Sequence, residues 1–547
     1  AAAINYGTGI LTLTTNEIVD TTRKDAGAVE GEGQNVPRRV NLTALSLQNK
    51  DTAVVRDRLF GFAKSDVIGL VDAEVTEFDA DTIVIKLTES QRVHAIAFSN
   101  TPGGDIDADS GGDGSAAILV ALPTSVVDIG TNRNVQRFSL VMQETADAIR
   151  PTITDATLNY GTGELVITAD EVVDATPSSN KVDLALFRIN NQAGDTAEGS
   201  STTMTGARVT EKDDLTVTIT LSEVERVSAL LTSGTLGGDG NGELAANVLE
   251  VAQGGVRDVA QNGQNVLANL RIVETADSIR PSILNATLNL STGEMAFQGD
   301  ETLDVRDASR VDLSKLFLAD ISGDDSVSLD GGQGLSSGSV YTALNPTGVR
   351  TNGLKGATTF SMVLTEVQRV AAIAISSTNG GDNDDLVLDC KAGGVRDMAG
   401  NLNVNAAGSS LNLRVVQTGD IIAPHLTSAS IHYGTGFVEL MFSETIRKPA
   451  SVNLEHAYAI NSDSDDIFAV TQPGNPLYST NALSLSDSTL LAANQSAFNV
   501  VQFRLSEKTR SLAIALSGTK GGNNDGALLL RLESGFLTDM GLNALQP

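Results

Sequence analysis

The sequence has little of several residue types, and each shortage narrows what the protein can do. It has one cysteine, Cys390, so no disulfide can form within the chain and stability must come from packed cores. It has no tryptophan, and aromatic residues make up 4% of its 547 residues, which disfavours a surface that stacks on sugars. No run of about 18 apolar residues occurs, so we expect no segment inserted in a membrane.

Basic residues are also few, and this shapes the expected partners. The chain has 37 bases against 68 acids, for a formal charge of −31. Such a surface repels phosphate backbones and anionic headgroups, so we expect no nucleic-acid partner. It attracts cations, and Ca²⁺ is the first candidate because hard cations prefer carboxylate and carbonyl oxygens. Solubility in a salty medium is the alternative explanation of the charge.

What the sequence does have is an internal repeat. Three landmarks recur four times in the same order, and the first is the segment that begins "NYGTG", "NYGTG", "NLSTG" and "HYGTG". The second is typified by "LTEVQRVAAIAISSTNGG", and the third by "VRDMAGN". Duplication of one domain explains this order. The predicted domains are 1–149, 150–279, 280–422 and 423–547, which we name the first to fourth copies.

The landmarks predict local structure. Alternating apolar residues on both sides of the first landmark indicate two strands joined by a hairpin whose glycine takes a positive φ. The second landmark continues a strand into a capping-box pattern, so we expect one or two helical turns there. The fold class is therefore all-β, with four tandem sandwiches that each carry a short helical turn. The hairpin glycines are Gly9, Gly163, Gly293 and Gly436, and the boxes run from Thr88 to Gln91, Ser222 to Glu225 and Thr365 to Gln368.

The boundaries and ends suggest how the copies are arranged. The boundary segments "TADAIRP", "TADSIRP" and "TGDIIAP" are short, which predicts an elongated, fairly stiff rod of roughly 150 Å at ~3.4 Å per strand residue. The first copy has an incomplete N-terminal strand, and the fourth stops before the closing strand that the second copy has in "VLANLRIVE". Either that segment has been trimmed from this sequence, or a neighbouring chain supplies a strand.

Taken together, the strand ending in "FSET" or "TADE", the "LTE..R..AI" segment and the terminal "VRDMAGN" turn resemble tandem bacterial-Ig-like repeats of very large cell-surface proteins. The resemblance covers essentially the whole chain. It implies four Ig-like β-sandwiches in an extracellular adhesin, surface layer or appendage fibre. It transfers no catalytic residues, and the copies are longer than typical repeats.

Two patterns could hold a cation. The loop "GGDIDADSGGDG" places Asp105, Asp107 and Asp109 at alternate positions with Asp113 beyond, as at the start of a calcium loop, although no Glu closes it. A solvated acidic loop is the alternative. The segments 322–325 and 461–466 show weaker acidic runs. A repeated glutamate also follows the first hairpin, where it could pair with the repeated arginine of the second landmark or help hold an ion near the Asp-x-x-x-Asn turn. These glutamates are Glu17, Glu171, Glu301 and Glu444, and a partly buried pair is expected for Arg226 and Arg369.

Other site patterns are sparse. Glycosylation sequons occur at Asn41, Asn285, Asn289 and Asn494, close to the number that chance supplies. Cys390 aligns with apolar residues of the other copies, which indicates a core position. We expect no enzyme, since no catalytic constellation stands out. The sequence predicts an extracellular structural subunit of a filament, surface appendage or surface layer that self-associates, by strand donation at its open ends. The alternative is the stalk or body of a cell-surface adhesin that binds a ligand through its loops.

Overall fold

The computed structural model describes the chain except for residues 22–39, 50–66, 77, 105–113, 137, 178–180, 195–199, 239–245, 306–309, 321–325, 331–355, 405–412, 448–450, 461–481, 492–498, 523–525 and 547. The chain forms two compact units that divide in sequence between Ile279 and Arg280. The first unit contains the first and second copies, and the second unit contains the third and fourth. The domain boundaries within each unit stay predictions.

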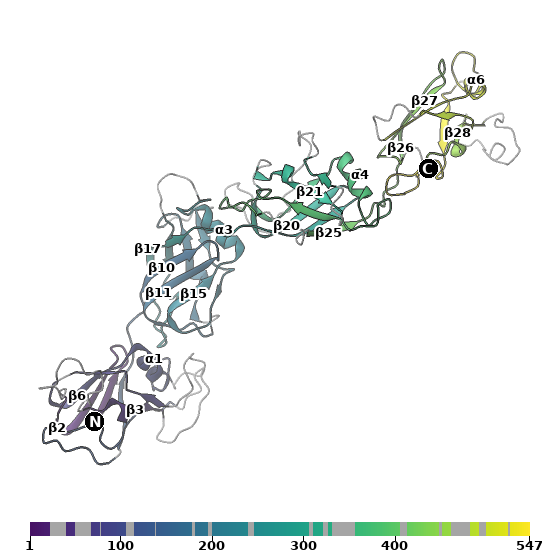
Figure 1. Cartoon of the computed structure of the whole chain (residues 1–547). Helices are drawn as coiled ribbons and strands as arrows, with labels where there is room; N and C mark the ends of the chain where they lie inside the picture. The colour runs from purple at the N-terminus through teal and green to yellow at the C-terminus, as the bar shows by residue number, and fades with distance from the viewer. Residues whose placement is uncertain are drawn as a thin grey trace. The chain divides into compact units, whose positions relative to one another are not determined.

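The first copy is a two-layer sandwich, near the N-terminus in Figure 1. Its sheets have the orders β5–β6–β2–β1–β9 and β4–β3–β7–β8. Alternate residues of both sheets, including Leu11 and Leu13 of β2 and Leu45 and Leu47 of β3, pack into one buried cluster. The strands are β1 Ala2–Asn5, β2 Ile10–Val19, β3 Leu45–Gln48, β4 Val67–Gly69, β5 Glu74–Val75, β6 Ala80–Lys86, β7 Ile118–Ala121, β8 Phe138–Val141 and β9 Gln143–Thr145.

The second copy repeats this topology. Its sheets have the orders β14–β15–β11–β10–β18 and β13–β12–β16–β17, which match those of the first copy position by position. The strands are β10 Ile153–Asn159, β11 Glu164–Val173, β12 Phe187–Asn190, β13 Ser201–Thr203, β14 Arg208–Val209, β15 Asp214–Thr220, β16 Val248–Val251, β17 Leu267–Arg271 and β18 Val273–Thr275.

The third copy joins its two layers through one strand. There β25 pairs with both β24 and β19, so a single seven-stranded sheet has the order β22–β21–β24–β25–β19–β20–β23. In the earlier copies the same stretch of chain is interrupted at Met142 and Ile272, which are buried. We name this stretch the closing strand: β8 and β9, β17 and β18, or β25. The third-copy strands are β19 Ile283–Asn289, β20 Glu294–Asp304, β21 Leu316–Ala319, β22 Ser326–Ser328, β23 Gly356–Val363, β24 Val387–Cys390 and β25 Leu413–Thr418.

The fourth copy has two separate sheets among its described residues. Its sheets have the orders β26–β27–β31–β30 and β29–β28–β32, and no described strand takes the place of the closing strand. The strands are β26 Leu426–His432, β27 Phe437–Phe442, β28 Ala457–Ile460, β29 Ala482–Ser484, β30 Thr489–Leu490, β31 Val500–Arg504 and β32 Leu529–Leu532. The all-β, multi-domain sandwich prediction is confirmed.

The predicted turns and helices are confirmed as well. The four hairpin glycines have φ between 66° and 71°. The helices are α1 Glu89–Ala97, α3 Glu223–Leu231, α4 Glu366–Ala374 and α6 Glu507–Leu516, and the first three begin with the predicted capping boxes. Short 3-10 helices lie at η1 Leu42–Ala44, η3 Leu184–Leu186, η5 Leu313–Lys315 and η6 Leu454–His456. No helix among the described residues is long and apolar enough to cross a membrane.

Candidate functional site at the junctions between copies

A buried arginine joins the first copy to the second. Arg92 lies on α1 and is 6% exposed. Its Nε and one terminal nitrogen bind both oxygens of Glu89 at 2.7 and 2.6 Å, in the same helix. Its other donors reach Asp147, which follows the closing strand, and Glu171 of the second copy at 2.9 Å. Glu89 in turn accepts from the backbone N–H of Val172 at 3.1 Å, so the pair bonds across the junction in both directions.

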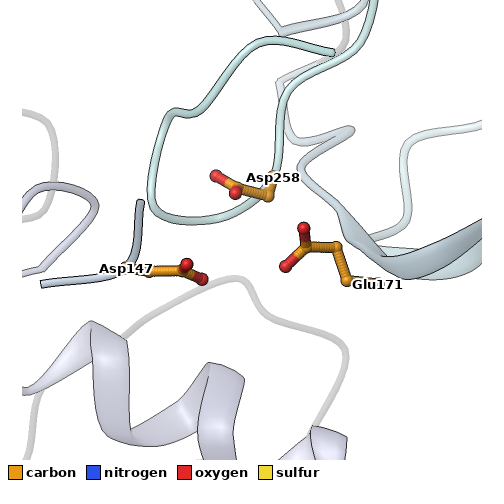
Figure 2. A group of neighbouring side chains, drawn as sticks. All are labelled: Asp147, Glu171 and Asp258. Carbon is orange, nitrogen blue, oxygen red and sulfur yellow. The ribbon is translucent and has the colours of Figure 1, made fainter. Parts of the chain in front are cut away.

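The third landmark of the second copy completes the cluster. Asp258 begins the Asp-x-x-x-Asn turn and accepts from the N–H and the side-chain amide of Asn262 at 2.7 and 2.9 Å. The same amide donates to the carbonyl of Asp147 at 3.2 Å. Figure 2 shows the carboxylates of Asp147, Glu171 and Asp258 turned toward a common point. One oxygen from each lies within 4.8 Å of the others.

The cluster carries excess negative charge in a buried place. Burial and then the charge of Asp258 raise the pKa of Glu171 to about 8, although Arg92 opposes this. Burial likewise raises the pKa of Asp258 to about 6, against its bonds from Asn262. Glu171 is 7% exposed, and its Oε1 has no hydrogen-bond partner among the described residues. An oxygen left unpaired in such a place favours a proton or a cation.

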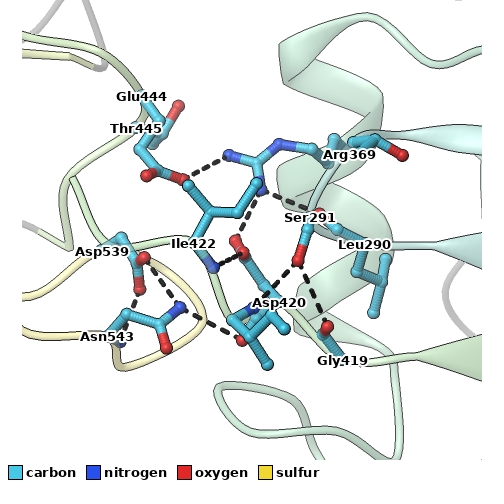
Figure 3. Close-up of polar contacts among 12 residues, drawn as sticks. Leu290, Ser291, Arg369, Gly419, Asp420, Ile422, Glu444, Thr445, Asp539 and Asn543 are labelled. Atoms are coloured by element: carbon cyan, nitrogen blue, oxygen red, sulfur yellow. Dashed lines mark hydrogen bonds and ion pairs between the residues drawn. The ribbon is translucent and has the colours of Figure 1, made fainter.

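The third and fourth copies are joined by the same arrangement, shown in Figure 3. Arg369 of α4 binds Asp420 at 2.7 Å and Glu444 of the fourth copy at 3.1 Å. Asn543 donates to Asp539 and to the carbonyl of Asp420 at 3.0 and 3.1 Å. Burial and the charges of Asp539 and Asp420 raise the pKa of Glu444 to about 7. One oxygen each of Asp420, Glu444 and Asp539 again lies within 4.8 Å of the others.

The glycine pair of the second landmark contacts the following copy. Gly103 has a φ of +82°, and a Cβ there would lie 2.0 Å from the carbonyl oxygen of Val259. Gly380 has a φ of +91°, and a Cβ there would lie 1.9 Å from the carbonyl oxygen of Met540. Both neighbours belong to the Asp-x-x-x-Asn turn of the next copy. Glycine is required because only a bare Cα fits against that turn.

The geometry of the carboxylates suits one divalent cation. Ca²⁺ binds oxygen at about 2.3–2.6 Å, so two of its ligands lie at most about 5 Å apart. At both junctions the three oxygens lie within 4.8 Å of one another, which meets this condition. Each cluster also offers one carboxylate oxygen with no partner among the described residues, on Glu171 or Glu444. These side chains could therefore hold a cation.

Pairing of the repeated glutamate with the repeated arginine is confirmed for Glu444 with Arg369, and it also occurs for Glu171 with Arg92. Arg226 and Arg369 are both 5% exposed and both pair with carboxylates. The repeated glutamates that pair with Arg92 and Arg369 come from the next copy rather than the same one, which the sequence did not predict. The sequence reasoning missed Asp147 and Asp420 entirely. Their signal was present, because every boundary segment carries an aspartate at that position.

The other predicted sites are distributed differently. Asp105, Asp107, Asp109 and Asp113, Asn494, and the runs 322–325 and 461–466 lie outside the described residues. In the third copy, the corresponding loop brings one carboxylate oxygen each of Asp382 and Asp384 to within 4.8 Å of one of Asp320. Asp382 and Asp384 are exposed, and Asp320 is buried.

The sequons and the cysteine occupy ordinary structural positions. Asn41 caps η1 by accepting from Thr43, Asn289 accepts from the N–H of Ser291, and Asn285 is exposed on β19. Cys390 packs against the core of the third copy, and burial raises the pKa of its thiol to about 12. The glycosylation candidates stay predictions.

Comparison with known proteins gives only weak similarity. No protein-family model and no curated protein matches the chain. A solved structure titled "Marsupial T cell receptor" is 11% identical, with a TM-score of 0.13, and the match covers 65% of this chain and 93% of that one. The N-terminal four Ig domains of Dscam1 are 10% identical, with a TM-score of 0.14, over 66% and 72% of the two chains. Domains 4–9 of the surface layer protein SbsC are 8% identical, with a TM-score of 0.12, over 72% and 52%. Scores this low carry no argument about function.

Proposed function

We propose that the protein is a non-enzymatic structural subunit of an extracellular filament, surface appendage or surface layer. It is built from tandem Ig-like modules whose junctions are stiffened by a divalent cation, Ca²⁺ first. The observation that supports this most is the junction cluster, which occurs at Arg92 and again at Arg369 with the same bonding pattern.

The junction resists hinge motion for a physical reason. Bending would separate Arg92 from Glu171 and Glu89 from the backbone of Val172, and these are charge-assisted bonds in a buried place. It would also separate Val172, Val259 and Ala260, which pack into the same apolar cluster as the first copy. A ligand site on one loop does not require stiff junctions. Repeating the same bonded junction along the chain is useful when the chain must keep a fixed length, as a structural subunit must.

The cation would act by neutralising charge. Each cluster places four carboxylates around one guanidinium, for example Glu89, Asp147, Glu171 and Asp258 around Arg92. A divalent ion bound only by the folded junction must raise the melting temperature. Asp147, Glu171 and Asp258 would hold it at the first junction, and Asp420, Glu444 and Asp539 at the second.

Two measurements test the proposal. Calorimetry of the full chain with 1 mM Ca²⁺ or with EGTA should show a higher melting temperature with calcium, and an unchanged one would remove the cation from the proposal. Negative-stain microscopy of concentrated chain should show regular fibres or sheets. Isolated particles at every concentration would favour the adhesin stalk instead.

A further inference from the structure

The Asp-x-x-x-Asn turn of the second copy differs from the other three turns in one residue. Its asparagine, Asn262, is followed by a glycine, whereas Asn132, Asn401 and Asn543 are followed by arginine, leucine and alanine. Asparagine is a chemically labile residue. A glycine after it favours attack of the backbone nitrogen on the side-chain amide, because glycine has no Cβ to hinder the approach.

The reaction at this pair needs no partner other than water. The nitrogen of Gly263 bonds to Cγ of Asn262 and gives up its proton, while the bond from Cγ to Nδ2 breaks and ammonia leaves with that proton. Water then opens the cyclic imide. Opening at the side-chain carbonyl gives aspartate, and opening at the backbone carbonyl gives isoaspartate, in which the main chain runs through the former side chain.

The closed junction holds Asn262 back from this reaction. Its side-chain amide donates to Asp258 at 2.9 Å and to the carbonyl of Asp147, in the boundary segment, at 3.2 Å. Its N–H donates to Asp258 at 2.7 Å, and its carbonyl accepts from the N–H of Asp258 at 3.1 Å. The amide nitrogen cannot leave as ammonia without breaking both of its bonds, so the reaction must wait for local opening of the junction.

The product is incompatible with the closed junction. The new carboxylate would face two acceptors, the carboxylate of Asp258 and the carbonyl of Asp147, where a donor stood before. The cluster already places four carboxylates around Arg92. A further buried negative charge without a partner is strongly unfavourable. Because ammonia is lost, the change runs in one direction.

We propose that Asn262–Gly263 is a self-modification site that the closed junction protects, and that its deamidation releases the second copy from the first. The rate at this pair then reports how often the junction opens. The inference rests on the bonds of the junction, and it holds whether or not the chain assembles into a filament.

The test follows deamidation of Asn262 in the full chain, in EGTA so that no cation is needed. Peptide mapping by mass spectrometry detects the exchange of an amino group for a hydroxyl, and it separates this site from the other Asn-Gly pairs, at 241–242, 352–353 and 379–380. A synthetic peptide of residues 256–268, VRDVAQNGQNVLA, gives the unprotected rate. We expect the folded chain to react slower than the peptide by roughly tenfold or more, since opening must come first.

Two variants open the junction in different ways. Arg92→Met removes the cation that binds Asp147 and Glu171. Gly103→Ala changes no charge, but places a Cβ against the carbonyl of Val259. Each should raise the rate at Asn262 by roughly tenfold or more, because the open state becomes more populated. Hydrogen exchange of 164–168, in β11, checks that the second copy stays folded.

Matched changes at the other junction control for general effects. Arg369→Met and Gly380→Ala make the same alterations between the third and fourth copies, and should leave the rate at Asn262 unchanged. Equal rates in the chain and the peptide, equal acceleration by these two controls, or no product in either opening variant while the peptide reacts would each overturn the inference.

The consequence of the reaction is tested separately, by Asn262→Asp. This variant reproduces one product, and it should speed hydrogen exchange of the N–H of Val172, which donates to Glu89 across the junction, by roughly tenfold. Asn132→Asp is the control, because Asn132 has the same bonds to Asp128 but is exposed. Unchanged exchange at Val172 in Asn262→Asp would show that the product does not open the junction.

Discussion

Glu171 offers the sharpest perturbation of the junction, because Glu171→Gln should have opposite effects without and with calcium. The change keeps the shape of the side chain but removes its charge. The pKa of Glu171 is raised from 4.5 to about 8 by burial and by Asp258. The folded state therefore binds more protons than the unfolded state between these values, and its stability falls as pH rises through that window. Glutamine abolishes this loss.

The magnitude follows from the same shift. A difference of about 3.5 pKa units corresponds to about 5 kcal/mol as an upper limit at pH 8.5, at 1.36 kcal/mol per unit. The lost ion pair with Arg92 and relaxation around the site offset part of it, so we expect roughly 2 kcal/mol of stabilisation in EGTA. For a unit of this size, that raises the melting temperature by several degrees. Below about pH 4 the carboxyl is protonated in both the folded and the unfolded state, and the variant should match the native chain.

With calcium, the native chain should have the higher melting temperature, the opposite of the order expected in EGTA. Glutamine is a poorer ligand than a carboxylate, so the variant should lose most of the calcium-dependent rise in melting temperature. Calorimetry of the full chain, with hydrogen exchange of residues 256–264 as a local measure, reads both effects. Glu17→Gln is the matched control, because Glu17 has the same place in the first copy and is exposed. If Glu171→Gln destabilised the junction in EGTA at pH 8.5, or left the calcium effect intact, the electrostatic reasoning would be refuted.

Three further perturbations test the junctions. Arg369→Met should cost about 3–5 kcal/mol by leaving buried carboxylates uncompensated, whereas Arg510→Met should lower the melting temperature much less, because Arg510 is more exposed and binds no described residue of a further copy. Gly380→Ala should lower the melting temperature more than Gly521→Ala: both glycines have positive φ, but only the first meets the backbone of the next copy, at Met540. In EGTA, raising the pH from about 5 to 8 should weaken the second junction, because the pKa of Glu444 is raised to about 7 and its ionisation in the folded state is unfavourable; a flat calorimetric profile would contradict this.

The fold could be predicted because its signals are local. Period-two alternation, the hairpin glycine and the capping box each lie within a dozen residues. The first two recur in four copies and the box in three, and these versions support one another. The helices α1, α3 and α4 begin at the predicted residues for that reason.

The site could be predicted only in part because its residues are far apart. Arg92 and Glu171 are 79 positions apart and belong to different copies. The sequence indicated that the repeated glutamate meets an arginine or an ion near the turn, but not that the meeting point is the joint itself. The aspartate of the boundary segment recurs at every boundary, but nothing near it in the sequence shows that it meets the arginine of the second landmark. The role of this aspartate becomes visible only in the structure, where it binds the arginine at the junction between two copies.

The parallel pairing of first and last strands has a mechanical consequence. β1 pairs with β9, β10 with β18, and β19 with β25, in each case side by side and in the same direction. Tension applied through the chain pulls the start of one strand and the end of its neighbour apart along their common axis. The backbone bonds between them then bear the load together in shear rather than opening one at a time. The first three copies are thus built to resist stretching.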